Sequence, residues 1–304
     1  MKYRRLGSTD LLVSVVGLGT WQFGGEWGRP YTQPDADAIL DKAAECGMNL
    51  IDTAECYGDH LSEALIGDYL ARHDRSRWIV ATKFGHQFHA FMDRTWHLKT
   101  VEVAQQLEAS LRALKTDYID IYQFHSGFDP EFQQPDLWDM LQNQKRAARV
   151  RHLGISISSK SGDLQARLAK QVGAEVLQVI YNRLEQRAEQ DFFPHAIQQD
   201  LGVLARIPLL SGFLSGKYTS AGPFPANDMR STIEPAKIQK WLSEVDQIRE
   251  KELPPGVPMA RWALAWCLNN PAVTSVIPGC KSPEQVEFNA SAADYSPPSC
   301  SGIS

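Results

Sequence analysis

The chain has 304 residues, of which 43% are hydrophobic and 22% are charged, an ordinary composition for a globular protein. This composition excludes wholesale disorder, and a chain of this length buries enough surface to fold without disulfides or structural metals. Lysine and arginine total 31 against 36 aspartate and glutamate residues, so the net charge of −5 argues against a general binder of nucleic acids or acidic membranes.

Short β-rich segments alternate with amphipathic helical segments along the chain. A β-hairpin is expected first, from residues 3–6 and 11–14 with a turn at residues 7–10. Eight strands are then expected at residues 15–18, 49–52, 78–83, 118–124, 151–156, 176–181, 202–207 and 274–277. Helices are expected between them, including residues 35–46, 61–72, 101–114 and 258–269. Thr100 is the expected N-cap of the third of these helices.

This alternation favours an α/β fold, a closed parallel (β/α)8 TIM barrel preceded by a β-hairpin, over a chain of two domains. No glycine-, serine- or proline-rich linker interrupts it, so we expect one domain over residues 1–295. Residues 296–304 have no periodicity and are expected to form a disordered tail. In such a barrel, catalytic side chains gather at the C-terminal ends of the strands.

The five cysteines form no CxxC pair and no zinc-finger spacing, and the first residues lead into no apolar segment of the signal-peptide type. The longest apolar runs are far shorter than the roughly 18 residues that a membrane span needs. These observations favour a cytoplasmic protein without disulfides, and we expect neither a membrane nor a nucleic-acid partner. No sequence feature indicates a self-association surface, so a monomer is the default expectation.

Four reactive side chains stand at or just beyond three neighbouring strand ends. Asp52 ends the second barrel strand and Tyr57 follows it, whereas Lys83 ends the third strand and His125 the fourth. An ammonium about 4 Å from a phenol supplies ~4 kcal/mol toward its ionisation at an effective dielectric of ~20. A carboxylate would hold that ammonium in place. We therefore expect Lys83, paired with Asp52, to lower the pKa of Tyr57 for proton transfer to a carbonyl.

The segments around these residues resemble the aldo-keto reductase superfamily. The matching stretches are residues 52–58 (DTAECYG), 81–85 (ATKFG), 123–126 (QFHS), 178–182 (QVIYN), 211–218 (SGFLSGKY) and 277–279 (IPG). They keep the family's order over roughly residues 3–290, and Arg206 in residues 205–208 (ARIP) resembles a bacterial branch. The resemblance implies an NADPH-dependent reductase that converts aldehydes, ketones or small sugars to alcohols. Tyr57 would be its general acid, and His125 would orient or polarise the carbonyl.

The resemblance also implies which residues hold NADPH, extended across the barrel mouth. Ser156 and Gln178 would bond the nicotinamide carboxamide, and Arg206 would stack on its ring. Further cofactor contacts are expected from Gly19, Thr20, Trp21, Asp52, Ile207, Pro208, Leu209, Ser211, Gly212, Leu214, Lys217, Gly279, Lys281, Gln285 and Asn289. Lys281 would bind the 2′-phosphate of NADPH. Because Phe288 replaces a glutamate of the family, NADH stays open as an alternative cofactor.

Aromatic residues near the strand ends indicate a pocket for small carbonyl compounds. The expected substrate contacts are Trp21, Trp27, Tyr57, His86 and His125. An alternative on the same scaffold is an NADPH-binding regulatory or sensor protein with little turnover, like the channel-associated β subunits that resemble this family. A metallohydrolase using Asp52, Glu55 and His125 is disfavoured, because the strand ends supply one histidine, and no metal site is expected.

Overall fold

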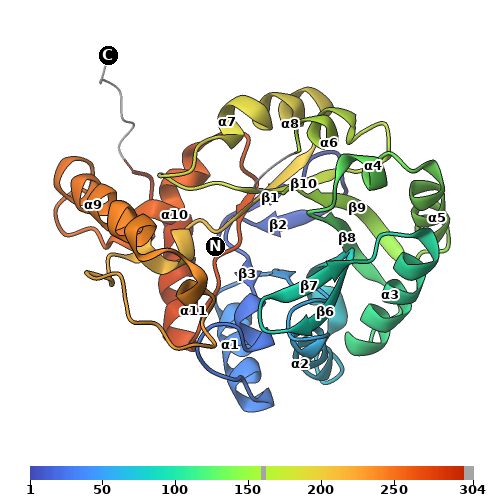
Figure 1. Ribbon diagram of the computed structural model, residues 1–304, viewed down its shortest axis with the longest axis horizontal. Coiled ribbons are helices and arrows are strands. Elements are labelled where there is room, and N and C mark those ends of the chain that lie inside the picture. Colours follow the sequence, from blue (N-terminus) through green and yellow to red (C-terminus); the bar gives the residue numbers. More distant parts are fainter. Residues whose placement is uncertain (159–161, 298–304) are drawn as a thin grey trace.

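A computed structural model describes residues 1–158 and 162–297 of the chain. The disorder expected for the tail falls mainly on residues 298–304, which lie outside the described residues. The described residues form a barrel of parallel strands surrounded by helices (Figure 1). Its strands are β3 (Leu18–Gly19), β4 (Leu50–Asp52), β5 (Ile79–Phe84), β8 (Ile119–His125), β9 (Val150–Ser156), β10 (Val176–Ile180), β11 (Gly202–Arg206) and β12 (Ser275–Val276).

The sheet closes on itself, which confirms the predicted (β/α)8 barrel. Its strands are ordered β3-β4-β5-β8-β9-β10-β11-β12, and bridges from Val16 to Val276 and from Gly19 to Gly279 join its two edges. A Cβ at Gly19 would lie 2.7 Å from the Ile277 carbonyl oxygen, so glycine permits this close approach. The predicted strands are confirmed to within about two residues, except the first, whose regular pairing begins only at Leu18.

A helix follows each barrel strand and covers the outside of the sheet (Figure 1). These helices are α1 (Gln33–Glu45), α2 (Leu61–Leu70), α3 (Thr100–Ala113), α5 (Pro135–Arg146), α6 (Asp163–Leu168), α8 (Phe193–Gln199), α10 (Met259–Asn269) and α11 (Pro283–Ala290). The predicted N-cap of α3 is wrong. Thr100 is its first helical residue, and the N-cap is Lys99, whose backbone N–H donates to the Glu102 carboxylate over 3.1 Å.

The predicted N-terminal hairpin is confirmed and plugs one end of the barrel. It consists of β1 (Tyr3–Arg5) and β2 (Leu12–Ser14), paired antiparallel. Leu6, Leu11 and Val13 are buried in one cluster with residues from inside the barrel, namely Leu50, Ile79, Ala81, Ile121, Val176, Leu204 and Ile277. Burying such a side chain contributes about 1.5–3 kcal/mol. The plug lies at the N-terminal ends of the strands and leaves their C-terminal ends to form a site.

A second hairpin projects from the end of β5, in a stretch where neither a strand nor a helix was predicted from the sequence. It consists of β6 (His86–Ala90) and β7 (Asp93–Trp96), with His86 opposite Trp96. The buried Glu26 carboxylate ties this hairpin to the loop after β3, because it accepts from the Met92 backbone N–H and from the Arg94 guanidinium. The hairpin is thereby fixed beside the C-terminal ends of the strands.

Outside the regular alternation, α9 (Pro235–Lys251) packs on η3 (Leu210–Ser215), the loop after β11. A separate apolar cluster that includes Phe213, Leu214 and Leu242 holds them together. Shorter helical turns are α4 (Asp129–Phe132), α7 (Ala188–Asp191), η1 (Trp21–Gly24), η2 (Arg75–Arg77), η4 (Met229–Thr232) and η5 (Ser291–Asp294). Within residues 1–158 and 162–297, no helix is both long and apolar enough to cross a membrane.

Candidate active site

Asp52, Tyr57 and Lys83 meet at the C-terminal end of the barrel. The fully buried Lys83 ammonium donates to the Asp52 carboxylate over 2.9 Å and to the Thr53 carbonyl over 2.6 Å. It also lies 3.1 Å from the Tyr57 hydroxyl oxygen. All three ammonium hydrogens therefore have acceptors, and a charge that is costly to bury is compensated.

The second oxygen of the Asp52 carboxylate is held from the far side of the barrel. Oδ1 accepts from Gln178 Nε2 over 2.6 Å, and Gln123 Nε2 lies 3.5 Å from the same oxygen. Ser156 donates in turn to Gln178 Oε1 over 3.4 Å. The two residues that the resemblance assigns to the nicotinamide carboxamide thus also orient the carboxylate that compensates Lys83.

Two glycines place the Tyr57 side chain against the loop after β3. Gly58 has a φ of +69°, and a Cβ there would lie 2.6 Å from the Gly24 carbonyl oxygen, so only glycine allows this backbone contact. The Tyr57 ring stacks on Trp21 with centroids 5.9 Å apart, and His125 meets it edge-on at 6.4 Å. These contacts hold the phenol beside Lys83.

Lys83 lowers the pKa of Tyr57, as predicted, but the net shift has the opposite direction. Burial raises the pKa of Tyr57 to about 12, although Lys83 acts in the opposite direction. The burial of the phenol, together with the negative charge of Asp52, outweighs the effect of the ammonium. The phenol is consequently protonated at neutral pH, which is the state that a proton donor requires.

His125 lines the same site, and a second histidine lies against it. His86, the first residue of β6, brings its Nδ1 to 3.2 Å from His125 Nδ1. Burial lowers the pKa of His125 well below its usual value and the pKa of His86 to about 4. Both rings are therefore neutral at physiological pH.

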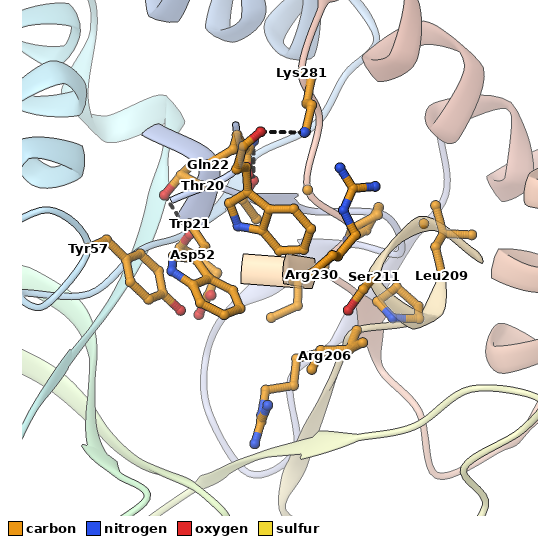
Figure 2. Close-up of a pocket in the computed structure, with 18 of the residues that line it drawn as sticks. Thr20, Trp21, Gln22, Asp52, Tyr57, Arg206, Leu209, Ser211, Arg230 and Lys281 are labelled. Carbon is orange, nitrogen blue, oxygen red and sulfur yellow. Dashed lines mark hydrogen bonds between the residues drawn. The ribbon is translucent and has the colours of Figure 1, made fainter. Parts of the chain in front are cut away.

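A cavity of about 850 Å³ opens beside these residues, a size typical of ligand pockets. Figure 2 shows Asp52 and Tyr57 on one side of it and Leu209 and Ser211 on the other. The predicted cofactor and substrate residues that line this cavity are Gly19, Thr20, Trp21, Trp27, Asp52, Tyr57, His86, His125, Gln178, Arg206, Ile207, Pro208, Leu209, Ser211, Gly212, Lys217, Gly279, Lys281, Gln285 and Asn289.

Three predicted site residues do not line the cavity. Lys83 and Ser156 are fully buried and act on it through Tyr57, Asp52 and Gln178. Leu214 is buried in the apolar cluster beneath α9, so it supports the loop after β11 without facing a ligand. Leu214 was expected to contact the cofactor, and the side on which its side chain packs could not be assigned from the sequence.

Two features of the cavity fit an extended ligand with many hydrogen-bond acceptors. They are the backbone of the loop after β11 and two N–H donors that have no hydrogen-bond partner in the described part of the chain. Leu210 and Ser211 have φ values of +48° and +56°, a strained conformation for residues other than glycine that is common at ligand sites. Within the described ranges, the buried Trp27 Nε1 and Arg206 Nε atoms have no hydrogen-bond partner. Acceptor atoms of a dinucleotide would satisfy such donors.

Positive charge gathers at the part of the cavity remote from Tyr57. Lys217, Arg230 and Lys281 all line it, and Figure 2 shows Lys281 and Arg230 away from the phenol. Arg230 is buried and donates to both Asp228 carboxylate oxygens. Burial and the neighbouring cations, Arg230 foremost, lower the pKa of Lys281. Clustered cations of this kind attract phosphate groups.

Sequence reasoning missed several residues that shape the site. They are Glu26, which accepts from Trp21 Nε1 over 2.7 Å, and Arg94 and Arg230. Glu26 and Arg94 are 68 positions apart, and no local pattern links them. The alternating aromatic residues after β5 were the one available indication of the hairpin that carries Arg94, since such alternation is typical of a hairpin.

The comparison with known families decides the class of this protein. The model of the Aldo/keto reductase family matches residues 15–299. The chain belongs to the aldo/keto reductase family. This is a family of oxidoreductases that use nicotinamide cofactors and act on small carbonyl compounds.

Relatives of this reductase-family chain differ in their described activities. The NADH-specific methylglyoxal reductase of Escherichia coli is 30% identical, covering 96% of this chain and 93% of the relative. A probable voltage-gated potassium channel subunit beta of Oryza sativa is 29% identical over 98% of this chain and 92% of its own. The holo form of aldo-keto reductase AKR11C1 from Bacillus halodurans superposes with a TM-score of 0.82 at 29% identity, covering 98% and 93% of the two chains.

Proposed function

We propose that this protein is an NADPH-dependent reductase of small aldehydes and ketones, with Tyr57 as the proton donor. The proposal is carried by one observation: the Tyr57 hydroxyl lies 3.1 Å from the buried Lys83 ammonium and lines a cavity of about 850 Å³. Trp21 and Trp27 pack edge-to-face with centroids 5.3 Å apart and form an aromatic wall of the cavity. Such a wall suits small apolar or sugar-like carbonyl compounds.

In this mechanism the residues of the chain orient the carbonyl and deliver one proton. When bound, the nicotinamide cofactor supplies the hydride that adds to the carbonyl carbon. Tyr57 donates a hydrogen bond to the carbonyl oxygen and transfers its proton as negative charge develops there. Lys83, 3.1 Å from the phenol oxygen, stabilises the phenolate that forms. Asp52, held by Gln178, keeps Lys83 in position.

A reactive aromatic aldehyde tests this function directly. Consumption of NADPH is followed by its absorbance, and binding of NADPH is measured separately by quenching of tryptophan fluorescence. We expect binding and turnover together. Binding of NADPH without reduction of any aldehyde or ketone would favour the alternative of a regulatory or sensor protein. The similarity to a probable potassium channel β subunit supports that alternative.

The preference for NADPH over NADH is proposed to depend on Lys281. Its ammonium lies at the cavity, donates to the Trp27 carbonyl over 2.6 Å and is 3.8 Å from the Asp228 carboxylate. A charged hydrogen bond contributes about 1.5–3 kcal/mol, so Lys281→Ala is expected to weaken NADPH binding about tenfold or more. NADH binding should change far less. As a control, Lys99→Ala replaces an exposed lysine on the N-terminal side of α3 and should change the binding of neither cofactor. Equal losses for both cofactors would contradict the assignment.

A further inference from the structure

The Nδ1 side of His125 faces a cluster of side chains that the mechanism above does not use. His86 Nδ1 lies 3.2 Å from His125 Nδ1, Cys56 Sγ lies 3.8 Å from it, and Glu55 Oε2 lies 4.0 Å from it. The polar atoms of all four side chains are within 4.8 Å of one another. Because Nδ1 faces this cluster, Nε2 is the ring nitrogen left for a substrate in the cavity that His125 lines.

The contact between the two histidines permits two hydrogen arrangements with opposite consequences. A neutral imidazole carries hydrogen on one nitrogen and a lone pair on the other. If His86 Nδ1 donates, His125 has its hydrogen on Nε2 and can donate to a substrate. If His125 Nδ1 donates, its Nε2 is bare and repels a carbonyl oxygen. The geometry of the pair alone does not choose between them.

The other two neighbours favour the first arrangement, because both carry hydrogen at neutral pH. Burial raises the pKa of the Cys56 thiol well above its usual value, and burial raises the pKa of Glu55 to about 8. Glu55 Oε1 accepts from the His86 backbone N–H over 2.9 Å. Glu55 Oε2 is buried and has no partner among the described residues, so it is the oxygen free to carry the acid hydrogen toward His125.

We infer that His86 and Glu55 are positioning residues that hold His125 in the tautomer with hydrogen on Nε2, so that it donates to the substrate carbonyl oxygen. The tautomer is a property of the free protein, whereas its catalytic consequence rests on the proposed reductase function. His125 then shares the carbonyl oxygen with the Tyr57 hydroxyl, and the single proton transferred comes from Tyr57. The oxygen gains one proton, and Tyr57 becomes a phenolate beside Lys83.

Nuclear magnetic resonance of the ligand-free protein with ¹⁵N-labelled histidine measures this tautomer without any turnover. The signals of His125 are identified by their loss in His125→Asn. At pH 7 we expect a protonated Nε2 and a bare Nδ1 in the wild type, and a substantial fraction of the opposite tautomer in His86→Phe. A wild-type His125 that carries its hydrogen on Nδ1 would overturn the inference, whatever the protein's activity.

Kinetics measures the consequence for catalysis. Loss of a hydrogen-bond donor to a developing oxyanion costs about 10²–10³-fold in kcat, so a partial loss in His86→Phe is expected to lower kcat about 10- to 100-fold. NADPH affinity should be retained. His86→Asn, whose amide N–H stands near the position of Nδ1, should recover part of the loss. His89→Phe, on the same strand with its ring bonded to Thr95, is the matched control and should behave as wild type. A wild-type kcat in His86→Phe would overturn the inference.

The variant Glu55→Gln distinguishes between two roles of Glu55, a protonated acid that donates hydrogen and a carboxylate that only accepts it. The glutamine amide copies the protonated acid: its oxygen accepts from the His86 backbone N–H, and its N–H replaces the acid O–H on the side that faces His125. It should therefore lose much less activity than His86→Phe. A loss as large as that of His86→Phe would show that Glu55 acts as a carboxylate, which contradicts the inference.

The pH profile gives an independent readout of Glu55. As pH rises through about 8, Glu55 loses its proton, and its carboxylate favours hydrogen on His125 Nδ1, so wild-type kcat should fall. The decline should be absent in Glu55→Gln. Besides Cys56, His86 and His125 within the cluster, the titratable and charged groups around it are His60, Glu63, Lys83, Arg94, Tyr122 and Arg206. The pKa of His86 is about 4, and that of Tyr57 is about 12, so neither explains a decline near pH 8. A wild-type decline that persists in Glu55→Gln would contradict the role of Glu55.

Discussion

Replacing Tyr57 by phenylalanine is expected to lower kcat for carbonyl reduction by about 10³-fold while NADPH binding is retained. A positioned general acid contributes about 10²–10⁴-fold, and phenylalanine removes only the hydroxyl that donates the proton. The phenylalanine ring can keep the stacking contact with Trp21, whose centroid lies 5.9 Å from that of Tyr57. The loss should therefore appear in kcat and not in cofactor affinity, as measured by NADPH oxidation and by fluorescence titration.

The stability of this variant separates a chemical role from a structural one. The Tyr57 hydroxyl contacts Lys83, but Lys83 keeps the Asp52 carboxylate and the Thr53 carbonyl as acceptors. No buried charge is left unpaired, so the free energy of unfolding should change by only about 1 kcal/mol. Tyr69→Phe, on α2 with its hydroxyl bonded to Asp41, is a control that should leave kcat unchanged. A Tyr57→Phe enzyme retaining a tenth of wild-type kcat would assign the proton donor elsewhere.

The positions of the reactive residues were predictable because a parallel barrel brings all strand ends to one face. Asp52, Lys83 and His125 lie at the ends of β4, β5 and β8, which are neighbours in the sheet. Their convergence follows from strand order, and strand order follows from the alternating pattern in the sequence. The N-terminal hairpin of β1 and β2 was also predictable from its turn. It lies at the end of the barrel opposite to the reactive residues.

Properties that depend on burial and on contacts distant in sequence were not predictable. The pKa of Tyr57 rises because its phenol is buried, a quantity that no local pattern encodes. His86 was expected as a substrate contact, yet its Nδ1 also lies 3.2 Å from Nδ1 of His125, which ends β8, the strand that pairs with β5. Glu26 joins Trp21 to Arg94 across 68 positions. Each of these contacts forms only when the loops of different strands assemble over the barrel.

Lys83→Met should impair both folding stability and catalysis, and the two effects should have separable causes. The side chain is fully buried, and its removal leaves the Asp52 carboxylate buried beside Gln178 without a countercharge. Breaking a buried pair in this way costs about 3–5 kcal/mol, so the Tm should fall by several degrees. Tyr57 loses the ammonium that stabilises its phenolate, a contribution of ~4 kcal/mol at an effective dielectric of ~20, and kcat should fall about 10³-fold.

The double variant Lys83→Met with Asp52→Asn distinguishes these causes. Asparagine removes the uncompensated charge and keeps an oxygen that accepts from Gln178, so most of the lost Tm should return. Activity should not return, because Tyr57 still has no cation beside it. If the double variant recovered kcat together with Tm, Lys83 would act only by holding the fold. If neither recovered, the Asp52–Lys83 pair would not be the source of the instability. The proposed mechanism requires Tm to return without kcat. Stability depends on the absence of an unpaired buried charge, whereas proton transfer requires the Lys83 ammonium itself.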